Sequence, residues 1–177
     1  MPLNQAVQYI EVNTFSREFG VTTTRRRAEP VGPLFEKFWQ EYRSSVARET
    51  ELSVKRKLEL QINPQLEEFT RYPLGWNSYG APPLRSDVKD FALSVLNSIM
   101  KARTPLPHVA PSSVGGLHVE WHEKGVDLEL HIIAPYDCDV WFCDCRDPNA
   151  QPVSDKIATA DFAVLSEPID LLTSRPD

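Results

Sequence analysis

Polar and apolar residues alternate strictly in two neighbouring stretches of the chain, 117–122 and 126–132. This alternation is typical of strands that turn one face to a core and the other to water. The polar positions hold metal-ligating and acid–base side chains: His118, Glu120, His122, Asp127, Glu129 and His131. Imidazoles and carboxylates that converge on a rigid sheet can bind zinc, iron or manganese, and a carboxylate beside an open coordination position can act as a base.

The apolar residues set the register of the expected hairpin. A two-residue turn at Lys124-Gly125 pairs Trp121 with Leu128, Val119 with Leu130 and Leu117 with Ile132, whereas a three-residue loop would mix the two faces. We expect Trp121, Leu128 and Leu130 to pack against the 87–102 helix. The polar pairs then follow: His118 opposite His131, Glu120 opposite Glu129, and His122 opposite Asp127. No HExxH helix or other metal-binding spacing accompanies these residues. A role without metal is therefore favoured, in which these polar residues form a solvated or partner-binding face.

The cysteines give no sign of a metal centre or a disulfide framework. Cys138, Cys143 and Cys145 are odd in number and lie within eight residues, without a CxxC pair. We interpret them as small apolar residues in or near the core, which suits a reducing cytoplasm. No phosphate-binding glycine loop, Walker motif or GxSxG elbow is present, so an enzyme is disfavoured and no cofactor is expected.

Residues 73–84, with the sequence PLGWNSYGAPPL, are the most distinctive loop. Trp76 and Tyr79 are large amphipathic side chains, and Gly75 and Gly80 permit backbone conformations that other residues avoid. The two aromatic residues either plug the core between helix and sheet or form an exposed recognition loop, since Trp and Tyr dominate interface hot spots.

The order GWNSYGAPP, amphipathic helix, proline-rich linker and GGLHVEW…VDLELHI resembles a family of small bacterial and mobile-element proteins. The family pattern is roughly GW(D/N)xYGAxP, a helix, and LEW and LEI strands, and the resemblance covers about residues 66–133. Here Asn77 stands where the family often has an acidic residue, and Val119 where it has Leu. The resemblance implies a shared fold core and, by association with prophage or defence islands, an antitoxin, immunity or anti-defence role.

The helical region is expected over residues 33–103. Gly32-Pro33 opens a helix with one apolar stripe, formed by Leu34, Phe35, Phe38, Trp39, Tyr42 and Val46. Residues 50–62 fit both strand and helix periodicities. A helix is favoured because this stretch consists of good helix formers, and Asn63-Pro64 is expected to end it. A short helix at 65–71 and a strong one at 87–102, with Ser86 as its N-cap, follow.

The remaining segments are expected to be irregular or to extend the sheet. Residues 1–32 contain two strand-like stretches, and Arg25–Arg27 either contact nucleic acid or an acidic partner or form a solvated strand end. The linker 104–116 is expected to be irregular. A third strand is predicted at 138–145, and residues 148–177 drape over the core or form one short helix. Together these predict a single α+β domain over 1–177, with helices packed on an antiparallel β-meander.

Charge placement favours a basic protein partner. The chain has a net charge of −6, which disfavours duplex nucleic acid, and no apolar stretch long enough for a membrane span or a secretion signal. Residues 116–147 hold eight acidic and two basic residues, whereas 17–59 hold ten basic and seven acidic ones. Such an acidic region can steer a basic partner toward it.

These observations predict a cytoplasmic, non-catalytic protein that binds and inhibits a partner in a toxin–antitoxin, immunity or phage–host conflict. Glu120, Asp127, Glu129 and Asp139 would steer the encounter, and Trp76 and Tyr79 would anchor it. The alternative is a metal-dependent enzyme that uses His118, His122, His131, Glu120, Glu129 and Asp127 on the outer face of the hairpin. The sequence leaves the oligomeric state open.

Overall fold

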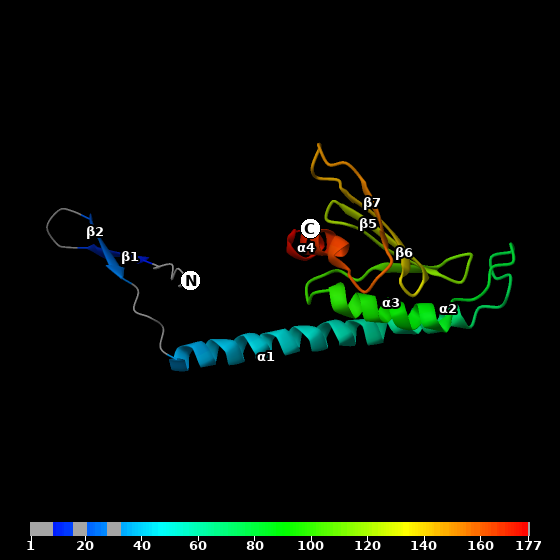
Figure 1. Ribbon diagram of the computed structural model, residues 1–177, viewed down its shortest axis with the longest axis horizontal. Coiled ribbons are helices and arrows are strands. Elements are labelled where there is room, and N and C mark those ends of the chain that lie inside the picture. Colours follow the sequence, from blue (N-terminus) through cyan, green and yellow to red (C-terminus); the bar gives the residue numbers. More distant parts are fainter. Residues whose placement is uncertain (1–8, 16–20, 28–32, 177) are drawn as a thin grey trace, which may run out of the picture. The chain divides into compact units, whose positions relative to one another are not determined.

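The computed structural model describes residues 9–15, 21–27 and 33–176, and side chains within 33–49 and 51–176 (Figure 1). Contacts divide the chain into two units, residues 1–45 and 46–177. Helices and antiparallel strands occur together, so the predicted α+β class is confirmed.

The first unit contains a β-hairpin and the start of a long helix. Strands β1 (Tyr9–Phe15) and β2 (Val21–Arg27) pair antiparallel, with Tyr9 opposite Arg27 and Phe15 opposite Val21. Both strand-like stretches of the sequence therefore form strands, and Arg25–Arg27 end β2. Helix α1 (Pro33–Lys57) begins at the proline expected to open it.

A π-helical turn joins α1 to the next helix without interruption. Residues Leu58–Ile62 (η1) are π-helical and lead directly into α2 (Asn63–Thr70). The predicted helix over 50–62 is confirmed, but the predicted end at Asn63-Pro64 is wrong. The N–H of Asn63 donates to the carbonyl of Leu58, five residues back. This wider turn accommodates Pro64, which lacks an N–H and would crowd a carbonyl in a regular α-helix.

Helix α3 (Ser86–Ile99) is the predicted 87–102 helix, shortened at its C-terminal end. The prediction of Ser86 as its N-cap is wrong: Ser86 is already helical, the N-cap position is Arg85, and no side chain caps the helix. The carboxylate of Asp87 instead accepts the N–H of Val88 and pairs with Arg85. Its negative charge still lies at the positive end of the helix dipole.

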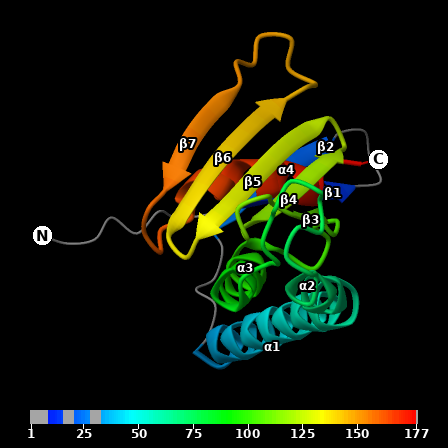
Figure 2. The same ribbon diagram turned by 90° about the vertical axis from the view of Figure 1, so that its right-hand side faces the viewer.

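Five antiparallel strands form a meander in chain order (Figure 2). They are β3 (His108–Pro111), β4 (Leu117–Glu123), β5 (Val126–Ala134), β6 (Asp137–Asp144) and β7 (Val153–Ile157). Every predicted β4–β5 pair is present, from Leu117 opposite Ile132 to His122 opposite Asp127. The two turn residues, Lys124 and Gly125, have φ of +55° and +71°, as a two-residue type I′ turn requires.

Two expected irregular segments contain regular structure. Strand β3 lies inside the predicted linker, where buried Val109 pairs with Val119 and Pro111 ends an edge strand. The C-terminal segment contributes β7, a 3₁₀ turn at Ala163–Leu165 and α4 (Ser166–Ser174). In β7 only Ile157 is buried, so its sequence shows little alternation.

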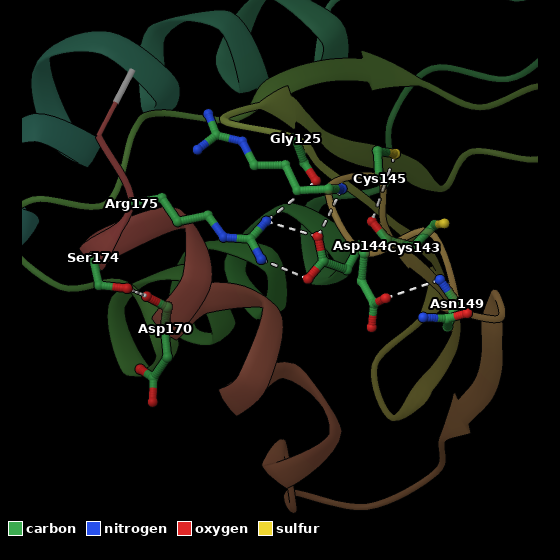
Figure 3. Close-up of polar contacts among 10 residues, drawn as sticks. Gly125, Cys143, Asp144, Cys145, Asn149, Asp170, Ser174 and Arg175 are labelled. Atoms are coloured by element: carbon green, nitrogen blue, oxygen red, sulfur yellow. Dashed lines mark hydrogen bonds and ion pairs between the residues drawn. The ribbon is translucent and has the colours of Figure 1, made fainter.

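The core lies between one face of the sheet and the helices. Trp121, Leu128 and Leu130 are at most 2% exposed, as predicted, and α3 contacts both β4 and β5. Helix α4 covers β5 on the same side. It is fastened by a hydrogen bond from Lys124 to the carbonyl of Leu172. A second hydrogen bond runs from Arg175 to the carbonyl of Gly125 (Figure 3). In Figure 2 the opposite face of the sheet is toward the viewer, with α4 behind the strands and neither α2 nor α3 in front of β5 to β7. We call this the outer face.

Candidate functional site: the outer face of the sheet

Strand register arranges the outward residues of the sheet into three rows. Neighbouring strands place these side chains directly opposite one another. The rows are His118, His131, Asp139 and Lys156; His108, Glu120, Glu129, Trp141 and Ser154; and His122, Asp127 and Cys143. The structure therefore brings all six predicted hairpin residues and Asp139 onto one face.

His118 and His131 stack on each other in the first row. Their ring centroids are 4.2 Å apart and the planes differ by 6°. The Nε2 atom of His131 is buried and has no hydrogen-bond partner among the residues that the structure describes. Burial lowers the pKa of His131 and His118 lowers it further, against the opposing effect of Asp139 and Asp137. These effects favour the neutral form of the His131 ring in the stack at neutral pH.

His122 lies between two carboxylates. Its Nδ1 is 3.1 Å from Asp127 Oδ1, and its Nε2 is 3.6 Å from Glu120 Oε2. The hydrogen bond to Asp127 raises the pKa of His122, and Glu120 adds to the effect. His108 Nδ1 lies 3.8 Å from the same Glu120 carboxylate. Sequence reasoning missed His108 because the alternation in four-residue β3 is too short to identify a strand.

A hollow of about 630 Å³ opens over the other end of the face. Its lining includes His118, Glu129, His131, Asp139, Trp141 and Lys156. Lys156 Nζ is 3.0 Å from Asp139 Oδ1, so the positive charge of Lys156 balances the negative charge of that carboxylate. Glu129 is exposed, lies opposite half-buried Trp141, and forms no ion pair or hydrogen bond with the described part of the chain. Trp141 and Lys156 were missed because only pairing with β6 and β7 brings them to the hairpin.

The histidines and carboxylates do not converge as metal ligands do. In the described ranges, no group of three or more His, Cys, Asp or Glu residues could hold a metal ion. The stacked rings of His118 and His131 face each other, so their nitrogens are not directed at a common point. The geometry thus gives the metal-enzyme alternative no support.

The cysteines fall into three environments, and all three are free. Cys138 is buried, which raises the pKa of its thiol to about 11, and Cys143 is partly exposed. The core interpretation is wrong for Cys145, which is exposed because β6 ends one residue before it. Its Sγ donates to Asp127 Oδ2 at 3.2 Å, a contact that raises the pKa of this thiol to about 11. A thiol held protonated is a poor nucleophile.

The loop 73–84 separates its two aromatic residues. Trp76 is partly buried; its indole donates to the carbonyl of Pro82 at 3.0 Å, and its ring lies 5.4 Å from that of Tyr72. Tyr79 is 93% exposed. Asn77 Oδ1 accepts the N–H groups of Tyr79 and Ala81, which fixes the shape of the loop. Trp76 therefore supports the loop from within, while Tyr79 projects from it.

In the portion of the chain that the structure describes, no helix combines the length and the apolar character needed to cross a membrane. No family model, curated protein or solved structure matches this chain.

Proposed function

We propose that this chain is a non-catalytic protein-binding protein whose outer face receives a basic segment of a partner and thereby inhibits it. One observation carries the proposal: Glu129 is exposed and forms no ion pair with the described residues, on a sheet face that neither α2, α3 nor α4 covers. The hollow beside it is open to a side chain from outside.

The surroundings of Glu129 favour a guanidinium or an ammonium group. The carboxylate can form charge-assisted hydrogen bonds, and the indole of Trp141 across the strand pair can receive the cation on its ring face. Arginine suits both interactions because its planar head binds carboxylates in two-point geometry and stacks on aromatic rings.

The other carboxylates contribute mainly to the approach of the partner. Glu120 and Asp127 share His122, and Asp139 is paired with Lys156, so each is partly compensated. Their field still steers a basic partner, in a manner that weakens as salt rises. Tyr79 adds an exposed anchor on a separate loop, whereas the Trp76 indole is engaged within its loop.

The resemblance to small bacterial and mobile-element proteins makes a toxin or a phage–host conflict the first setting to test. Nucleic-acid-handling toxins and effectors are often basic, which fits the charge of the outer face. For binding to inhibit the partner, the basic segment that is bound must belong to the partner's own active site or substrate-binding surface.

The test is capture of partners from the native host at low and moderate salt, followed by mass spectrometry. Three baits are compared: the unaltered chain, Glu129→Gln, and Glu68→Gln as a control for loss of one exposed, unpaired carboxylate on α2. We expect one basic protein to be lost with Glu129→Gln, kept with Glu68→Gln and weakened by salt. The captured protein should also lose activity on addition of the unaltered chain.

Failure to recover any partner at either salt would reject the proposal. So would retention of the partner after reversal of all four acidic charges at Glu120, Asp127, Glu129 and Asp139.

A further inference from the structure

Helix α1 exposes a continuous aromatic face near its N-terminus, which we call the α1 stripe. Its members recur at helical spacing and are between 38% and 85% exposed: Leu34, Phe35, Phe38, Trp39 and Tyr42. The rings contact one another, with centroids 5.7 Å apart for Phe35 and Trp39 and 5.5 Å apart for Trp39 and Tyr42. A contiguous apolar surface of this kind marks a site of protein association.

We propose that the α1 stripe of one chain packs against the α1 stripe of a second copy, with the two helices antiparallel. Because large side chains expose ~150–250 Å² each, the exposed fractions correspond to roughly 550 Å² per chain and ~1,100 Å² for the pair. Complete coverage of this exposed surface would bury just over the roughly 1,000 Å² that a specific interface requires.

The charges beside the α1 stripe are complementary to those of a second copy. On a helix with 3.6 residues per turn, Glu36 and Arg43 lie on one flank of the stripe, and Lys37 and Glu41 on the other. Equivalent flanks face each other in an antiparallel pair centred near Trp39. Glu36 of each chain then meets Arg43 of the other, and Lys37 meets Glu41, so every pair forms twice by symmetry.

The same four charges leave this segment without a net charge that would repel a second copy. They are the only ionisable charges in residues 33–46 and cancel, although the chain as a whole carries −6. Within one helix Glu36 and Arg43 are two turns, or about 10 Å, apart along the axis and do not form an i,i+4 pair. Lys37 and Glu41 already pair within one helix, with Nζ 3.9 Å from Oε1, so Glu36 and Arg43 are the charges left for a second chain to pair.

The first experiment compares two variants that add the same negative charge to opposite sides of α1. Phe38→Glu places it in the stripe, and Gln40→Glu places it on the opposite side, where the side chain is exposed. Sedimentation velocity between 1 and 100 μM, on the order of ordinary dimer affinities, gives the oligomeric state. We expect the unaltered chain and Gln40→Glu to be dimers and Phe38→Glu to dissociate at least tenfold more readily, with unchanged helical circular dichroism.

The second experiment tests the antiparallel pairing through the flank charges. Glu36→Arg gives two basic residues on that flank, and Arg43→Glu gives two acidic ones, so each variant alone should be a monomer. An equimolar mixture should form a heterodimer, and the double variant Glu36→Arg/Arg43→Glu should regain the homodimer.

A monomeric unaltered chain at 100 μM would overturn the proposal. Equal dimerisation of Phe38→Glu and Gln40→Glu would place the interface elsewhere and overturn it too. Failure of the mixed single variants to associate would reject the antiparallel pairing. The residues varied here are not residues of the outer face, so these outcomes do not depend on the partner of Glu129.

Discussion

Arg175, which ends α4, and Asp144, which ends β6, form a two-point ion pair across 31 positions of sequence. Arg175 Nη1 lies 2.7 Å from Asp144 Oδ1, and Nη2 lies 2.5 Å from Oδ2 (Figure 3). Both side chains are less than one fifth exposed. The hydrogen bonds from Arg175 are the main reason that the pKa of Asp144 falls to about 2. Together with the bond from Arg175 to Gly125, the pair fastens the last helix to the sheet.

Arg175→Met should reduce the free energy of unfolding at neutral pH. The carboxyl of Asp144 has a lower pKa in the folded chain than the ~3.9 of an unfolded aspartate, so the pair stabilises above that value. Its contribution should decrease as pH falls from about 4 toward 2. Urea unfolding of both proteins across this range measures the difference.

Lys156→Met is the matched control, because it removes a cation from the much more exposed pair with Asp139. It should change stability little. An effect equal to that of Arg175→Met would contradict a special role for the Arg175–Asp144 pair.

Trp121→Ala should cost roughly 3–5 kcal/mol, since it removes a large buried ring from the core. Trp121→Phe should cost less, about 1–3 kcal/mol, because it mainly leaves the carbonyl of Pro105 without the indole N–H at 2.9 Å. His122→Ala, one residue along on the outer face, should stay within about 0.5 kcal/mol. Thermal and urea unfolding measure the three losses of stability. A different order of the three variants would contradict the prediction.

His131 and His122 should titrate on opposite sides of the ordinary histidine pKa of ~6.5. The pKa of His131 is lower in the folded chain than in the unfolded one. Its contribution to stability is therefore lost as pH falls below the unfolded value of ~6.5. Because the pKa of His122 is raised, its contribution is present below ~6.5 and is lost as pH rises through the folded-state pKa. NMR titration of the four histidine ring signals measures both.

Asp127→Asn separates the two effects in the same titration. It should lower the pKa of His122 by removing the charge that raises it, and leave His131 essentially unchanged. Titration of His131 above His122 in the unaltered chain would be inconsistent with the partly buried stack.

Asn77→Ala should destabilise the chain by about 1–2 kcal/mol, because the N–H groups of Tyr79 and Ala81 lose their shared acceptor. Asn77→Asp should be nearly neutral, since a carboxylate offers an oxygen in the same place. Similar losses from both variants would show that the amide nitrogen, rather than Oδ1, matters.

The register of the 117–132 hairpin could be predicted because the information is local. Apolar residues alternate on both strands, and only a two-residue turn at Lys124-Gly125 places them opposite one another. That constraint also fixed three polar pairs of the outer face without knowledge of any other strand. The core side chains Trp121, Leu128 and Leu130 followed from the same pattern.

The rest of the outer face depends on pairing between distant segments. Trp141 and Lys156 join Glu129 and His131 only when β6 and β7 add to the sheet, and β7 has one buried residue to indicate it. His108 similarly needs β4 as a partner for its short strand. Short strands derive their stability from neighbours rather than from their own sequence, so propensity does not reveal them.

Periodicity also identifies an apolar face without showing what covers it. The stripes of α1 and α3 have similar spacing, yet Val88, Ala92 and Val95 of α3 are buried while Phe38 of α1 is 57% exposed. The sequence by itself determined which residues share a face and which pair across one tight turn, because those relations follow from backbone geometry. Only the tertiary structure decided which faces are buried, because burial depends on segments far away in the chain.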